Sequence, residues 1–144
     1  MKTVADILET KGREVWAIDP ETIVFDALKT MADKNVGALV VLDGAKVAGI
    51  LSERDYARKV ILHGRSSREL KTREIMSVHV YFVSPEQNVE DCMALFTNKR
   101  VRHLPVLQND ELIGLISIGD VVKAVIAEQE STIKHLENYI TGGR

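Results

Sequence analysis

The sequence has little cysteine and no long apolar run, and each shortage excludes a class of protein. Cys92 is the only cysteine among the 144 residues, so an internal disulfide and a cysteine-rich metal site are excluded. The most apolar stretch, Val36 to Leu42, is far shorter than the roughly 20 residues of a membrane-spanning helix. Asp6 stands where a secretory signal would be apolar, so we expect no export signal. These features predict a cytoplasmic protein that does not contact membranes.

Neither sign of charge is in large excess. The chain has 19 lysines and arginines against 21 aspartates and glutamates, a formal charge of −2. A balanced charge gives no strong attraction to nucleic acid, so we expect no nucleic-acid partner. Four scattered histidines, without the spacing of metal ligands, predict no metal site; they are His63, His79, His103 and His135.

The chain contains an internal duplication at a constant offset of 65 residues, which requires no gap. Prolines, glycines, serines and acids recur in register, among them Pro20 with Pro85, Gly49 with Gly114, Ser52 with Ser117, and Asp55 with Asp120. A shorter echo precedes each copy, since Ala5 to Leu8 resembles Arg73 to Met76. Each repeat unit is therefore expected to begin before its first strand.

Each copy shows the same succession of patterns. A short β-rich run ends at a proline, a segment of helical apolar spacing follows, and then come two apolar runs around turn residues, before a second helix. The expected strands are Val15–Asp19, Ala38–Leu42 and Lys46–Leu51 in the first copy, and Val80–Val83, Leu104–Leu107 and Leu112–Ile116 in the second. The β-α-β-β-α order, present twice, predicts an α+β fold.

We place the domain boundaries by the polar, glycine- and serine-bearing stretch that follows the first copy. The prediction is a first unit over 1–64 with its N-terminal lead-in, a linker over 65–71, a second unit over 72–127 and a helical extension over 128–144. Apolar residues at alternating steps of four and three line one seam of this extension, which should end near Gly142 and Gly143. The seam could fold onto its own domain or form a contact between two chains of a homodimer.

Two heptapeptides at the same place in the repeat carry a family resemblance. Residues 49–55, Gly-Ile-Leu-Ser-Glu-Arg-Asp, and residues 114–120, Gly-Leu-Ile-Ser-Ile-Gly-Asp, resemble the signature of CBS domains. The resemblance implies a Bateman module, in which two CBS units pack around a pseudo-twofold axis. Such modules bind AMP, ADP, ATP, NAD or S-adenosylmethionine in clefts between the units and regulate an effector protein. The resemblance therefore implies that this protein is a non-catalytic sensor that requires no cofactor beyond this ligand.

By the same resemblance, Asp55 and Asp120 would hold ribose hydroxyls, while Ser52 and Ser117 would lie near phosphate. Arg102 and His103 have no basic counterpart in the first copy, so the two clefts should differ. The expected main site consists of Ser117, Ile118, Gly119, Asp120, Arg102, His103, Thr10, Lys11, Gly12, Val15, Val36, Gly37 and Ala38. The expected second site consists of Ser52, Arg54, Asp55, Ser77, Val80 and Val101.

A purely structural interpretation of the same residues stays open at this point. Serine followed by aspartate three positions later is also a helix capping box. A second hypothesis for the function is an interaction or dimerisation scaffold with vestigial clefts. A nucleotide hydrolase is disfavoured, because Asp120 stands where a phosphate-binding loop needs lysine and no nucleophile is paired with a base.

Overall fold

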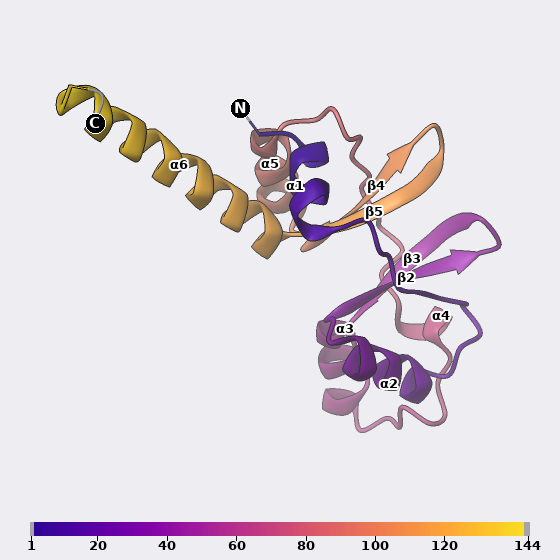
Figure 1. Cartoon of the computed structure of the whole chain (residues 1–144). Helices are drawn as coiled ribbons and strands as arrows, with labels where there is room; N and C mark the ends of the chain where they lie inside the picture. The colour runs from indigo at the N-terminus through magenta and orange to yellow at the C-terminus, as the bar shows by residue number, and fades with distance from the viewer. Residues whose placement is uncertain (1, 143–144) are drawn as a thin grey trace. The chain divides into compact units, whose positions relative to one another are not determined.

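The computed structural model describes residues 2–142, so Gly143 at the expected helix end lies outside the described residues. The chain folds into helices and short strands in the order α1 (Val4–Lys11), β1 (Ala17–Ile18), α2 (Val24–Lys34), β2 (Ala38–Asp43), β3 (Lys46–Ser52), α3 (Glu53–Lys59), η1 (Ile61–His63), α4 (Thr72–Ile75), α5 (Val89–Lys99), β4 (His103–Gln108), β5 (Glu111–Ser117) and α6 (Ile118–Ile140) (Figure 1). This succession confirms the predicted α+β fold with two copies of one motif.

The chain divides into two compact units, each of which combines one copy of the repeat with the lead-in of the other copy. Residues 14–81 form one unit, which we call the continuous unit. Residues up to 13 and from 82 onward form the other, which we call the split unit. Helix α1 is thus part of the unit that contains the second copy, and α4 is part of the unit that contains the first. The boundaries at 64, 72 and 128 therefore stay predictions about the sequence repeat.

The continuous unit is a three-stranded sheet of order β1-β2-β3 with helices packed on it. Strand β1 runs parallel to β2, and β2 pairs antiparallel with β3. Its core collects apolar side chains from the sheet, from α2 and from the segment around α4, namely Val24, Ala27, Met31, Leu39, Val41, Leu51, Val60, Leu70 and Ile75. The helical spacing of Val24, Ala27 and Met31 correctly predicted the buried face of α2.

The repeat seen in the sequence extends to irregular features of the backbone. Each hairpin shifts register at the same place, between Val41 and Leu42 in the first and between Val106 and Leu107 in the second. The helix before each hairpin ends on a residue in the left-handed conformation, Asn35 with φ 55° or its counterpart Arg100 with φ 53°. The common offset of 65 therefore describes equivalent positions in space within each unit.

The predicted first strand of the second copy is mostly wrong. Of Val80–Val83, only Val83 pairs with a strand, by a parallel bridge to Val106. In the first copy, Val40 N donates to Trp16 O at 3.1 Å. Pro105 stands at the position that matches Val40, and a proline has no N–H to donate. The ladder therefore cannot extend beyond Val83 as it does in β1, and the sheet of the split unit contains only β4 and β5.

Helix α6 begins directly after β5 and its first turns pack on the split unit, where Val121 is fully buried. Figure 1 shows that the C-terminal half of α6 extends away from α1 and α5. No helix in the described part of the chain combines the length and apolar character needed to cross a membrane.

Candidate functional site

Both Ser-x-x-Asp motifs form helix capping boxes, as the structural interpretation predicted. Ser117 N donates to Asp120 Oδ2 at 2.8 Å, and Asp120 N donates to Ser117 Oγ at 3.2 Å. The same pair of contacts joins Ser52 and Asp55, at 2.9 and 3.2 Å. Each aspartate thus has a fixed orientation at the start of α6 or α3. Capping holds the carboxylate in place without using all of its capacity to accept hydrogen bonds.

Asp120 also forms an ion pair with a residue that is distant in sequence. Lys11 Nζ lies 2.6 Å from Asp120 Oδ2 and donates to Leu115 O at 2.7 Å. Burial raises the pKa of Asp120, but the hydrogen bonds from Lys11 and from Ser117 outweigh it, so the pKa lies below the usual 3.8. Asp120 is therefore a carboxylate at neutral pH. We expected Lys11 to frame adenine, whereas in the split unit its ammonium group neutralises Asp120.

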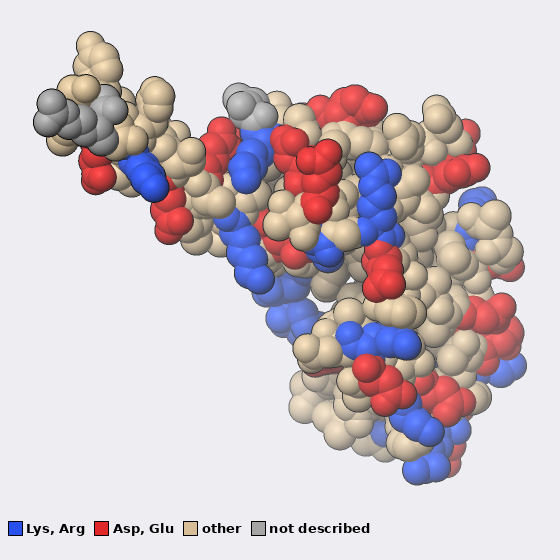
Figure 2. Space-filling view, in the orientation of Figure 1, with Lys and Arg blue, Asp and Glu red and all other residues tan. Residues whose placement is uncertain are grey.

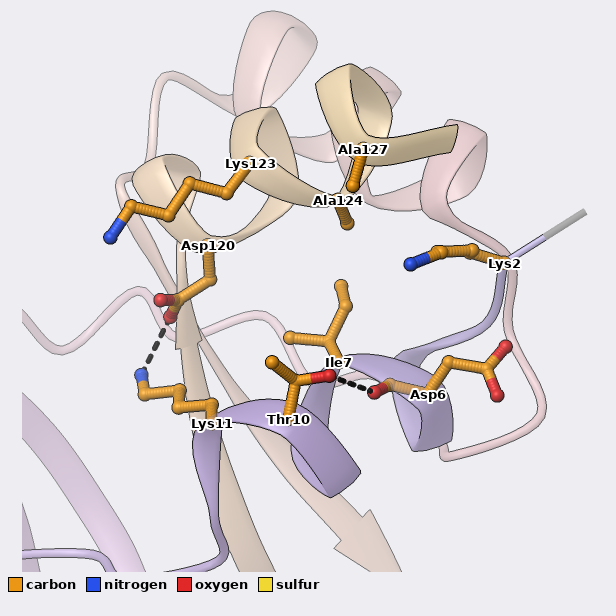
Figure 3. Close-up of a pocket in the computed structure, with 9 residues that line it drawn as sticks. All are labelled: Lys2, Asp6, Ile7, Thr10, Lys11, Asp120, Lys123, Ala124 and Ala127. Atoms are coloured by element: carbon orange, nitrogen blue, oxygen red, sulfur yellow. Dashed lines mark hydrogen bonds and ion pairs between the residues drawn. The ribbon is translucent and has the colours of Figure 1, made fainter. Parts of the chain in front are cut away.

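A pocket of about 400 Å³ opens beside this ion pair, within the split unit. Figure 3 shows that side chains of α1 line one wall and side chains of α6 line the other. The lining residues are Lys2, Asp6, Ile7, Thr10, Lys11, Asp120, Lys123, Ala124 and Ala127. Three of the predicted site residues, Thr10, Lys11 and Asp120, are thus brought together. The remaining six were missed. Asp6 and Ile7 belong to the lead-in echo, which did not indicate a site, and no motif marks the other four.

Arg102 and His103 occupy the same backbone positions as Gly37 and Ala38 in the first copy. Arg102 O accepts from Ile118 N at 3.0 Å, and Gly37 O accepts from Glu53 N at the same distance. His103 lies opposite Ser117 in the β4–β5 ladder, as Ala38 lies opposite Ser52. The backbone of both residues therefore lies beside the start of α6, with Arg102 next to Ile118 and His103 next to Ser117.

Gly12 ends α1 with φ 99°, a conformation that a side chain would strain, and its N–H donates to Leu8 O at 2.7 Å. Val15, Val36, Gly37 and Ala38 belong to the continuous unit. Their place in a site with Asp120 stays a prediction.

The second predicted site is partly assembled within the continuous unit. Ser77 Oγ donates to Asp55 Oδ1 at 3.2 Å, so Ser52, Asp55 and Ser77 lie together. Lys59 Nζ reaches the same Oδ1 at 3.1 Å. The sequence could have indicated Lys59, because a residue four positions after an acid on a helix lies on the same face.

Arg54 follows Ser52 on α3, and Val80 also belongs to this unit, whereas Val101 belongs to the split unit. A second site that combines them stays a prediction.

The two aspartates differ in how fully the protein already uses them. Asp55 is 8% exposed, and both of its oxygens accept hydrogen bonds or ion pairs. The contacts of Asp120 with Ser117 and Lys11 all reach Oδ2. Of these two aspartates, Asp120 is therefore the one with a carboxylate oxygen, Oδ1, that has capacity for a ligand.

Cys92 lies in the core of the split unit and is fully buried. Burial, together with the charge of Asp91, raises the pKa of its thiol to about 11. A thiol with so high a pKa is a poor nucleophile at neutral pH. Within residues 2–142, no three histidine, cysteine, aspartate or glutamate side chains are grouped so that they could hold a metal ion.

Comparisons with known proteins agree with the repeat and with the fold. The family model described as "CBS domain" matches residues 4–62 and 73–127. The mitochondrial CBS domain-containing protein CBSX3 of Arabidopsis thaliana is 42% identical over 151 residues, which cover 98% of this chain and 73% of the relative. YhcV of Bacillus subtilis, also a CBS domain-containing protein, is 28% identical over 118 residues, 82% of this chain and 84% of the relative.

Solved structures give the same result. A putative signal-transduction protein with CBS domains from Burkholderia ambifaria is 53% identical, with a TM-score of 0.84 over 89% of this chain and 96% of the other. The CBS domain pair of MJ0100, in complex with 5-methylthioadenosine and S-adenosyl-L-methionine, is 18% identical, with a TM-score of 0.78 over 89% of this chain and 98% of the other, a likeness of fold alone. With its duplicated motif, its two capping signatures and these matches, the chain belongs to the CBS-domain family as a tandem pair of CBS domains.

Proposed function

We propose that the protein is a non-catalytic sensor that binds an adenine nucleotide or a related adenosine compound at Asp120. The observation that supports this most is the state of the Asp120 carboxylate. It is charged, it is held in place by Ser117 and Lys11, and its Oδ1 has capacity to accept hydrogen bonds. Ribose hydroxyls donate hydrogen bonds, so a fixed carboxylate is a suitable acceptor for them.

The start of α6 offers a place for phosphate beside the ribose. The first N–H groups of a helix have no intrahelical partners and favour an anion. Ile118 N already donates to Arg102 O and Asp120 N to Ser117 Oγ, which leaves the N–H of Gly119 for a phosphate oxygen. A Cβ at Gly119 would meet only Ser117 Oγ, at 3.6 Å. Arg102 supplies a positive charge, and His103 is the second side chain that we expect to contact the phosphate.

The site at Asp55 is the weaker of the two in this proposal. A ligand there must displace either Ser77 or Lys59 from Asp55 Oδ1, because both oxygens are occupied. Breaking a contact to a nearly buried carboxylate lowers the net affinity. Arg54, on the adjoining helix, is the basic residue that we expect to contact phosphate at this second site.

The ligand class rests on the sequence signature and on one fold relative. The MJ0100 domain pair holds 5-methylthioadenosine and S-adenosyl-L-methionine, which share adenosine with AMP, ATP and NAD. Binding at a cleft that includes residues of both units would favour one arrangement of the two over others. An effector protein would then respond to that arrangement. The predicted cytoplasmic location stays a prediction, because the Arabidopsis relative is mitochondrial.

Thermal unfolding in the presence of AMP, ADP, ATP, NAD and S-adenosylmethionine tests the proposal. A ligand at a hundredfold excess over its Kd stabilises the folded protein by about 2.7 kcal/mol, a clear increase in Tm. Asp120→Ala should abolish this increase.

Asp120→Ala also removes one half of the capping box that begins α6, so Asn88→Ala, which removes a cap in the same unit, is the control. Asn88 caps α5 in the same unit, through a 2.8 Å bond from Asp91 N. Both variants should lower the Tm of the free protein, at a cost of about 1 kcal/mol for a lost cap. Only Asp120→Ala should lose the response to ligand. An absence of any response in the wild type would instead favour the interaction scaffold.

A further inference from the structure

Helix α6 carries, along most of its length, large apolar side chains that are exposed. Val121, in the first turn of α6, is fully buried. Five apolar residues further along the helix are between 40% and 81% exposed, namely Val122, Ile126, Ile133, Leu136 and Ile140. In Figure 2 the projecting end of α6 shows uncharged surface between a few charged side chains.

These side chains form a single seam. With Gln129 among them, they follow one another at alternating steps of four and three residues, the heptad spacing of a coiled coil. The twelve residues from 129 to 140 are all exposed. A helix of about this length is marginal in water without packing against an apolar partner. The seam therefore needs a partner of matching length.

We propose that the partner is α6 of a second molecule, packed antiparallel in a two-stranded coiled coil. In this alignment every seam residue has a partner in register. Val122 packs against Ile140 of the second molecule, Ile126 against its Leu136, and Gln129 against its Ile133. The twofold symmetry of the dimer repeats each of these three contacts. The seam therefore forms six layers of paired side chains, and every seam residue is used. Gln129, the single polar residue of the seam, lies near the centre, where such residues fix register at a cost in stability.

Charge favours the antiparallel alignment over the parallel one. Lys123 flanks the seam at one end and Glu137 at the other, on the same side. In the antiparallel pair each Lys123 faces Glu137 of the other molecule, which gives two opposite-charge contacts. A parallel pair would place Val125 beside Glu130 and Thr132 beside Glu137, without one opposite-charge contact. Glu130 faces its own copy at the centre, so removal of that repulsion should strengthen the dimer.

Mass and cross-linking measurements on the full chain test this proposal. Light scattering after gel filtration should give a dimer mass, which falls towards the monomer mass on dilution. The double variant Ile126→Cys/Leu136→Cys should form intermolecular disulfides on oxidation. Within one helix the two cysteines are about 15 Å apart, too far for an internal bond. The variant Ile133→Cys alone should not form an intermolecular disulfide, because residue 133 lies opposite residue 133 of the second molecule only in a parallel pair.

A charge exchange separates the proposed contact from general destabilisation. Glu137→Lys should weaken the dimer several-fold, and Lys123→Glu combined with Glu137→Lys should restore it. Asn138→Lys, on the opposite face of α6, is the control and should leave the dimer unchanged. Circular dichroism would check that each variant stays folded. A monomer at every concentration, cross-linking through Ile133→Cys alone, or no restoration by the exchange would each overturn the proposal. All three results are independent of nucleotide binding.

Discussion

Lys11 Nζ and Asp120 Oδ2 lie 2.6 Å apart although 109 positions of sequence separate them. This ion pair joins the lead-in helix α1 to the start of α6 within the split unit. It holds the carboxylate that we propose as the ligand-binding group, and it leaves Oδ1 of that carboxylate available. The lead-in thus belongs to the candidate site as well as to the core.

The ion pair should appear in the pH dependence of stability. Because the folded protein lowers the pKa of Asp120, the stabilisation is present above about pH 4 and is lost as the pH falls through the folded-state pKa. Lys11→Met should lower the free energy of unfolding at pH 7 by at most about 1 kcal/mol, since Lys11 is 36% exposed and solvent screens the pair. Urea unfolding between pH 7 and pH 3 measures this difference, which should become smaller towards the acid end.

Lys46→Met is the control, because Lys46 is exposed and has no ion pair among the residues that the structure describes. Its effect should not change with pH over this range. An equal pH profile for the two variants would contradict the assigned role of Lys11.

The glycines of the two signatures should tolerate a methyl group unequally. A Cβ at Gly49 would lie 2.6 Å from Ser77 O, a backbone atom, whereas at Gly114 it would lie 2.7 Å from Leu8 Cδ2. A side-chain methyl can move more easily than a backbone carbonyl that accepts from Ile50 N at 3.0 Å. Gly49→Ala should therefore cost more, about 1–3 kcal/mol for overpacking. Denaturant unfolding measures the loss of stability in Gly49→Ala and in Gly114→Ala. A larger loss for Gly114→Ala would contradict the packing described around the two glycines.

Cys92 should report opening of the split unit. Its thiol is buried and has a pKa of about 11, so a disulfide reagent at pH 8 should react much more slowly than with the unfolded chain. A ligand that stabilises the split unit should slow the reaction further, because reaction then requires a rarer opening. Asn88→Ala should speed it. Rapid reaction of the native protein would contradict the burial of Cys92.

Local patterns predicted the helix on each side of both hairpins, the hairpins themselves and both capping boxes, because each depends on residues close in sequence. The helices α1 and α4 were not predicted, since their segments were recognised only as a lead-in to each copy. Spacing of Val24, Ala27 and Met31 was enough to predict the buried face of α2. The failure at Val80–Val83 has a local cause that the sequence contained. Pro105 has no backbone N–H to donate to a neighbouring strand. This limits the pairing of Val80–Val83 only because β4, which contains Pro105, lies beside Val83.

The candidate site was less predictable, because its contacts are long-range. The signature identified Asp120, but nothing in the sequence indicated that Lys11 would reach its Oδ2. Nor did the repeat indicate that Leu8 would pack against Gly114, which places α1 in the split unit. The difference between Asp55 and Asp120 likewise depends on Ser77 and Lys59, which have no equivalent contact at Asp120.

Equilibrium titration of the wild type, Asp120→Asn and Asp55→Asn with the adenine compound that stabilises the protein tests the central claim most directly. Asparagine keeps the size of the side chain while removing its charge. Asp120→Asn should remove the tighter binding event, whereas Asp55→Asn should leave the Kd of that event within about threefold, less than 1 kcal/mol. A tight event that survives Asp120→Asn, or one that only Asp55→Asn removes, would contradict the proposed role of Asp120.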